Sequence, residues 1–116
     1  MPRSIALDEL ATLLGVLAHR DRIRLVEELR SVECDVAHLA EALEVSPSRV
    51  SQHLALLRSH RVVSKRKEGR HAYYRLVDER LARWLIDGLD FLEAEVAASE
   101  RLRAAVIEAR SQFSDD

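Results

Sequence analysis

The sequence predicts a mainly α-helical protein that carries one small β-hairpin. Apolar residues recur at helical spacing along most of the chain, and a short stretch around a Glu-Gly pair has the pattern of two strands joined by a turn. Only three Gly and two Pro occur in 116 residues, so few positions interrupt a helix. The length suits a single domain that covers residues 1–116. The predicted order of its elements is α-α-α-α-β-β-α.

Two helices are predicted at the N-terminal end. The first covers residues 5–17, with Ser4 as a favourable cap. Its apolar positions follow the i, i+3, i+4, i+7 spacing of an amphipathic helix: Leu10, Leu13, Leu14 and Leu17. Asp21 can cap the second helix, which we expect to end near Ser31. The apolar stripe of this second helix consists of Ile23, Val26 and Leu29.

Residues 36–59 have the pattern of a recognition unit made of two helices and a tight turn. The first helix covers 36–43 and is expected to bury Val36, Leu39, Ala40 and Leu43. Ser46 caps the next helix, and Pro47 takes its first position, where the fixed backbone angle suits a helix and the missing N–H costs nothing. The inner stripe of this helix is Val50, Leu54 and Leu57. Such a helix-turn-helix usually places its second helix in the DNA major groove.

Basic side chains are concentrated in one part of a slightly acidic protein. Residues 46–75 hold eight basic residues and one acidic residue, a net charge of +7, whereas the whole chain has a net charge of −2. The flanking segments, 1–45 and 76–116, therefore carry net charges of −4 and −5. A basic block that includes the recognition unit indicates a surface for a polyanion, namely double-stranded DNA.

The wing covers residues 62–77. We expect a strand over 62–67, a turn at Glu68 and Gly69, and a returning strand over 70–77. The basic side chains expected near its tip are Lys65, Lys67, Arg70 and His71. They can reach phosphates or a minor groove, which positions a protein on DNA without reading much sequence.

A long last helix is predicted over residues 78–110. Its apolar positions are spaced nearly as a heptad: Leu81, Leu85, Leu89, Leu92 and Val96. A helix of this length extends beyond a domain of this size, so we expect its apolar stripe to contact a second copy of the chain.

Three motifs, in this order along the chain, resemble the ArsR/SmtB family of bacterial winged-helix repressors. They are LAHRDRIRLVEEL at 17–29, HLAEALEVSPSRVSQHLALLRSHRVV at 38–63 and KEGRHAYYRL at 67–76. The resemblance implies a homodimer formed through the first and last helices, binding to an inverted-repeat operator, and release when an effector binds.

The expected DNA-binding residues follow from the exposed side of the recognition helix and from the resemblance. They are Ser46, Ser48, Arg49, Ser51, Gln52 and His53 in the recognition helix, and Lys65, Lys67, Arg70 and His71 in the wing. Arg and Gln can make two hydrogen bonds each to guanine and adenine edges. For His53 an alternative stays open, in which the ring is partly buried and bonds a neighbouring main-chain group.

The metal sites of the family are largely absent. Many members bind a thiophilic metal through two cysteines at the start of the third helix, but the matching positions here are Asp35 and Ala37, and Cys34 falls one residue away. A second family site on the last helix begins at the position of Asp78. Its other three positions hold Arg80, Phe91 and Ala94. We therefore expect no cofactor and no metal ion.

Two alternatives remain for the segment around Cys34. Cys34, Asp35 and His38 offer sulfur, oxygen and nitrogen within one helical turn and could hold a metal ion, with His19 as a remote fourth donor. Otherwise Cys34 packs as a small apolar residue, Asp35 caps the third helix and His38 is solvated. Because Cys34 is the only cysteine, a thiol switch would need an intermolecular disulfide or a reversible cap.

The remaining patterns argue against other classes of protein. The sequence has no Gly-rich phosphate loop, no HExxH and no GxSxG, so we do not expect an enzyme. No apolar run approaches the length of a membrane span, which predicts a cytoplasmic protein without a membrane partner. The function that competes with operator binding is a protein-interaction module on a winged-helix frame, which would bind a partner through its last helix.

Overall fold

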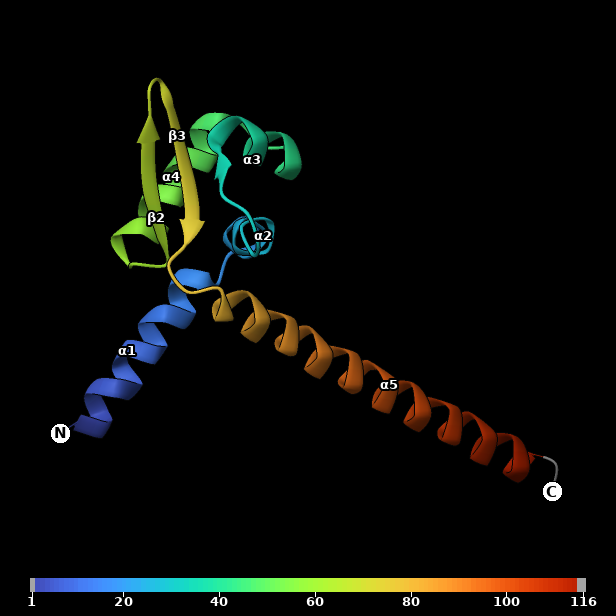
Figure 1. Ribbon diagram of the computed structural model, residues 1–116. Coiled ribbons are helices and arrows are strands. Elements are labelled where there is room, and N and C mark those ends of the chain that lie inside the picture. The colour runs from blue at the N-terminus through green and yellow to red at the C-terminus, as the bar shows by residue number, and fades with distance from the viewer. Residues whose placement is uncertain (1, 115–116) are drawn as a thin grey trace. The chain divides into compact units, whose positions relative to one another are not determined.

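The computed structural model describes residues 2–114 and has the predicted mainly α architecture with a β-hairpin (Figure 1). The elements in chain order are α1 (Pro2–Leu17), α2 (Arg20–Glu28), β1 (Cys34–Asp35), α3 (Val36–Leu43), α4 (Pro47–Ser59), β2 (Val63–Glu68), β3 (His71–Leu76) and α5 (Arg80–Ser114). The chain divides into two compact units, the first ending at Ala82 and the second beginning at Arg83. The predicted order is confirmed, with the addition of β1.

Helix α1 begins at Pro2, three residues before the predicted start at residue 5. Proline is tolerated in the first turn of a helix, so Pro2 is compatible with this earlier start. Ser4 therefore lies inside the helix, and its prediction as the cap was wrong. Only the last turn enters the core, through Val16 and Leu17. The earlier apolar positions remain open to solvent in the single chain, with Leu10 44% and Leu14 48% exposed.

Helix α2 is capped by His19, whereas the sequence predicted Asp21. The backbone of His19 is extended, and its Nδ1 atom accepts a hydrogen bond of 3.0 Å from the Asp21 N–H. Asp21 itself lies in the first turn, where its negative charge suits the positive end of the helix dipole. The helix ends at Glu28, before the predicted Ser31. Its buried face is Leu25 and Val26, followed by Leu29.

Helices α3 and α4 form the predicted helix-turn-helix. The carboxylate of Asp35 caps α3 by accepting the His38 N–H at 2.8 Å, and the hydroxyl of Ser46 caps α4 by accepting the Arg49 N–H at 3.2 Å. Pro47 follows Ser46 at the start of α4, as predicted. The facing sides are buried and consist of Leu39, Ala40 and Leu43 from α3 and Val50, Leu54 and Leu57 from α4. Val36 was predicted to be buried but is only half-buried.

The sheet has three antiparallel strands in the order β1-β3-β2. The hairpin register pairs Glu68 with His71, so the turn consists of Gly69 and Arg70 and the predicted Glu68–Gly69 turn was shifted by one residue. Gly69 has φ +60, a backbone angle that glycine adopts without a steric penalty. On the other side of β3, Cys34 pairs with Tyr74. This pairing anchors the wing to the segment that leads into α3.

Helix α5 begins at Arg80 and ends at Ser114, whereas the sequence predicted 78–110. Asp78 precedes the helix, and its carboxylate accepts the Arg80 N–H at 2.9 Å. Much of the predicted apolar stripe is exposed in the single chain, with Leu89 60%, Leu92 57% and Val96 57% accessible. No helix in the described part of the chain is both long and apolar enough to cross a membrane.

Candidate nucleic-acid interface

The outer side of α4 exposes four polar side chains. Ser48, Arg49, Ser51 and Gln52 are all exposed, whereas the inner stripe of the same helix is fully buried. Ser46 is exposed as well, but its oxygen already accepts the hydrogen bond that caps the helix. The helix is thus held by its apolar stripe and its cap, and its polar side chains are free to meet a ligand.

His53 faces a different direction from these residues. Its side chain is only 12% exposed, and its Nε2 atom lies 3.6 Å from Oδ2 of Asp21 at the start of α2. The ring also lies close to His19, with 4.5 Å between the two ring centroids. The structure therefore places His53 between α4 and α2, apart from the exposed polar side of α4.

The surroundings of His53 favour its neutral form. Its pKa is lowered from the ordinary value, first by burial and then by His19, Arg22 and Arg49, while Asp21 acts in the opposite direction. A neutral imidazole at neutral pH can accept a hydrogen bond or bind a metal ion through one nitrogen.

The tip of the wing presents Lys67, Arg70 and His71, all of which are exposed. Lys65 lies further down β2 and is half-buried, with its Nζ 5.9 Å from the centre of the Tyr74 ring. Of the four predicted wing residues, Arg70 lies in the two-residue turn and His71 directly follows it. Lys65 instead lies where part of its side chain covers an aromatic ring.

Arg66 was not distinguished from the other basic residues in the sequence, but it has specific partners. Its guanidinium donates hydrogen bonds to Glu33 and Glu68, and it lies 4.9 Å from the centre of the Tyr73 ring. The bond from Arg66 lowers the pKa of the Glu33 carboxyl. One cation of the basic block is thus paired with two carboxylates of the protein, and it links β2 to the residue before β1.

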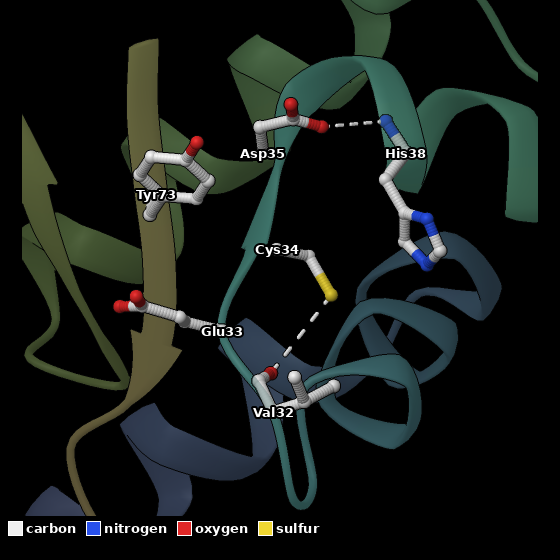
Figure 2. A pocket seen from close by; sticks show the side chains of 6 residues that line it. All are labelled: Val32, Glu33, Cys34, Asp35, His38 and Tyr73. Carbon is white, nitrogen blue, oxygen red and sulfur yellow. Dashed lines mark hydrogen bonds between the residues drawn. The ribbon is translucent and has the colours of Figure 1, made fainter. Parts of the chain in front are cut away.

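The segment around Cys34 lines an open pocket beside β3 (Figure 2). Cys34 is buried, and its Sγ lies 3.8 Å from the carbonyl oxygen of Val32. Figure 2 shows the Cys34 sulfur directed toward that carbonyl, while the Asp35 carboxylate points to the main-chain nitrogen of His38. Burial, followed by the charges of nearby acidic residues, raises the pKa of the thiol. A protonated thiol is a poor nucleophile and a poor metal ligand.

The described residues contain one cluster of at least three side chains suited to holding a metal ion, and it is not the predicted one. His19, Asp21 and His53 bring their ligand atoms within 4.8 Å of one another, while Cys34, Asp35 and His38 do not form such a group. No local sequence pattern indicates this cluster, because His53 lies in α4 whereas His19 and Asp21 lie at the start of α2. Only packing of α4 against α2 brings them together.

The position that matches the second family metal site is occupied by an ion pair. The carboxylate of Asp78 binds the Arg80 guanidinium at 2.7 Å, which, with the Arg80 main-chain bond, holds the pKa of Asp78 at about 2. The two remaining positions, Phe91 and Ala94, have no side-chain atom that could bind a metal ion.

Known proteins similar to this chain share its sequence pattern and its fold. The profile described as "Bacterial regulatory protein, arsR family" matches residues 19–65. The transcriptional repressor SmtB homolog of Synechocystis is 37% identical over 95 residues, which cover 79% of this chain and 72% of that protein. The HTH-type transcriptional repressor SmtB of Mycobacterium tuberculosis is 41% identical over 88 residues, covering 76% of this chain and 64% of that protein.

A solved structure extends the similarity to the fold. Reduced HlyU from Vibrio cholerae matches with a TM-score of 0.68 and 31% identity, over 78% of this chain and 95% of that one. The helix-turn-helix, the wing and these relatives together identify the chain as a member of the ArsR/SmtB family of winged-helix regulatory proteins.

Proposed function

We propose that the protein represses transcription by binding, as a homodimer, to an inverted-repeat operator. The observation that carries the proposal is the exposed polar side of α4, on which Arg49 and Gln52 lie within the segment of net charge +7. In this proposal α4, within the recognition unit 36–59, enters the major groove, and the wing at 62–77 contacts phosphates. The relatives are named transcriptional repressors, which favours this function over a protein-interaction module.

The proposed roles differ between the helix and the wing. Arg49 and Gln52 can form paired hydrogen bonds to base edges, each worth about 1–3 kcal/mol of discrimination against a wrong base. Ser48 and Ser51 add single polar contacts beside them. Lys67 and Arg70 neutralise phosphates and His71 adds a polar contact to the DNA backbone, so all three contribute equally on any sequence. His53 acts from behind the helix by holding α4 against α2, since its ring is directed at Asp21.

The test is to select preferred sites from random duplexes and then to measure binding to the selected operator and to a scrambled duplex. Arg49→Ala or Gln52→Ala should lower the ratio of the two affinities by about 30-fold or more, since one bidentate contact worth about 1–3 kcal/mol is lost in each of the two half-sites. Lys67→Ala should weaken both duplexes alike. The matched control is Arg58→Ala, because Arg58 is exposed and lies nine residues from Arg49, on the opposite side of α4. An equal decrease of the affinity ratio in Arg49→Ala and Arg58→Ala would contradict the role of Arg49 in reading bases. If the selection yields no preferred site, the protein-interaction module is favoured instead.

The homodimer is proposed to form through α1 and α5. In the single chain both helices expose apolar side chains at helical spacing, including Leu10 and Leu14 of α1 and Leu89, Leu92 and Val96 of α5. A second copy that covers these side chains removes apolar surface from water, at about 25 cal/mol for each Å². The segment 78–110 is the proposed dimerisation helix.

Sedimentation equilibrium tests the dimer. The double variant Leu89→Glu with Leu92→Glu should sediment as a monomer, because it places two charges in the proposed seam. Ala94→Glu with Ala98→Glu is the matched control, since these positions lie on the opposite side of α5 and add the same charge. A wild-type monomer at micromolar concentration, or equal dissociation of both double variants, would contradict the proposed seam.

A further inference from the structure

His19, Asp21 and His53 form a cluster between the start of α2 and the middle of α4. Their ligand atoms all lie within 4.8 Å of one another. The Nε2 atom of His53 is 3.6 Å from Oδ2 of Asp21, and the rings of His19 and His53 are 4.5 Å apart with an interplanar angle of 51°. Asp21 and His53 are half-buried and His19 is exposed, so the cluster has one side open to solvent.

We propose that this cluster binds one divalent first-row transition-metal ion, with two imidazole nitrogens and one carboxylate oxygen as the protein ligands. These donor types suit zinc and the neighbouring ions cobalt and nickel, whereas a soft thiophilic ion would need sulfur. Three protein ligands leave a fourth position for water, which the open side of the cluster can supply. The proposal concerns a site outside the surface that is proposed to contact DNA.

The spacing of the donors allows coordination after a small adjustment. Zinc binds imidazole nitrogen and carboxylate oxygen at roughly 2.0–2.2 Å, so tetrahedral ligand atoms lie roughly 3.3 Å apart. The distance from Nε2 of His53 to Oδ2 of Asp21 is 3.6 Å, close to that spacing before any movement. His19 must supply most of the remaining movement, and it is the exposed member of the cluster.

The ion would compete with the cap of α2. Nδ1 of His19 accepts the Asp21 N–H at 3.0 Å, and a neutral imidazole has only one unprotonated nitrogen. Coordination therefore either takes that lone pair or requires the proton to move to Nδ1, and the capping hydrogen bond is lost in both cases. His53 is better prepared, because its surroundings favour the neutral ring that a metal ion requires.

Two arginines limit the affinity. Arg22 and Arg49 are close enough to His53 to disfavour a positive charge there, and Asp21 is the only carboxylate in the cluster. The Nε atom of Arg22 is held in place by a hydrogen bond of 2.6 Å to the carbonyl oxygen of Val16. Replacing Arg49 by glutamine should therefore strengthen metal binding, which would not be expected at a site elsewhere in the chain.

The experiment is a titration of the full chain with Co²⁺ in the absence of DNA, followed by displacement with Zn²⁺. We expect one ion per chain, with the absorption bands of a nitrogen- and oxygen-bound cobalt ion and no thiolate-to-cobalt charge-transfer band. His19→Gln and His53→Gln should each weaken binding at least 10-fold, and Asp21→Asn should do so with little change in side-chain shape. Arg49→Gln should tighten binding several-fold.

His38→Gln and Cys34→Ser are the controls, because they remove an imidazole and a thiol from the pocket beside β3, outside the proposed cluster. Both should bind cobalt as the wild type does. A charge-transfer band, loss of binding in Cys34→Ser or His38→Gln, or no saturable binding by wild type at millimolar Co²⁺ would overturn the proposal. Circular dichroism of each variant separates loss of a ligand from loss of the fold. Since no DNA is present, the result is independent of the function proposed above.

Discussion

Asp21 and His53 connect two helices that the sequence separates, with 3.6 Å between Oδ2 of the carboxylate and Nε2 of the ring. Asp21 belongs to the first turn of α2, and His53 lies in the middle of α4. The contact is on the inner side of α4, while Arg49 and Gln52 are exposed on another side of the same helix. The contact between His53 and Asp21 thus helps to orient α4, and with it Arg49 and Gln52, although neither residue takes part in that contact.

Acidification should destabilise the protein through His53. The pKa of His53 in the folded protein is below its ordinary value of 6.5, so the unfolded chain takes up this proton at a higher pH than the folded chain does. Neutral His53 therefore makes its full contribution to the free energy of unfolding above pH 6.5. This contribution is lost as the pH falls through the pKa of His53 in the folded protein. We expect the free energy of unfolding of the wild type to decrease from pH 7 to pH 5, and His53→Gln to lack this part of the decrease.

Urea unfolding at a series of pH values measures the effect. Asp21→Asn is an informative companion, because the Asp21 carboxylate opposes the lowering of the His53 pKa. Its removal should lower that pKa further and steepen the loss of stability on acidification. Equal pH slopes for wild type and His53→Gln would contradict the interpretation.

Asp35 should stabilise the protein as a helix cap. Its carboxylate accepts the His38 N–H at 2.8 Å at the start of α3. Asp35→Ala should lower the free energy of unfolding by about 1 kcal/mol, since this is the usual cost of removing an N-cap side chain. Asp35→Asn should restore most of the loss, because asparagine is an equally good cap. Thermal or urea unfolding distinguishes the variants. If Asp35→Ala and Asp35→Asn lower the free energy of unfolding equally, the charge of Asp35 matters more than its capping hydrogen bond.

Arg66 and Lys67 are neighbours in β2, but we expect them to differ in DNA binding. Arg66 is paired with Glu33 and Glu68, whereas Lys67 is exposed near the tip of the wing. Lys67→Ala should reduce the slope of log affinity against log salt by about one for each subunit, because one phosphate contact is lost. Arg66→Ala should change the slope less, because its charge is already balanced by two carboxylates. Fluorescence anisotropy at several salt concentrations tests this, and a larger change for Arg66→Ala would refute it.

Cys34 should react slowly with alkylating reagents in the folded protein. Its side chain is buried and its pKa is raised, so little thiolate forms near neutral pH. We expect iodoacetamide to modify the native protein at pH 7.5 at least 10-fold more slowly than the urea-unfolded chain. Mass spectrometry at timed intervals gives both rates. Rapid modification of the native protein would instead favour the thiol switch at this residue.

The elements that the sequence predicted well are those stabilised by near neighbours in the chain. The cap by Ser46, the position of Pro47 and the buried stripe of α4 each depend on residues within a few positions of one another, and all were found where expected. The hairpin was predicted with its turn shifted by one residue, because several pairings of the strands leave a glycine in the turn. The cap of α2 was assigned to Asp21, since histidine is an uncommon capping residue and Asp is a frequent one.

The sequence by itself determined the class of the fold, the helix-turn-helix and the position of the basic block, because hydrophobic spacing, caps and charge are local properties of the chain. Tertiary structure alone decided which remote side chains meet. It paired Cys34 with Tyr74 in the short strand β1, placed Arg66 against Glu33, and brought His53 to Asp21. Each of these contacts joins segments that are far apart along the chain, and the packing of buried apolar faces, not any local pattern, sets their distance.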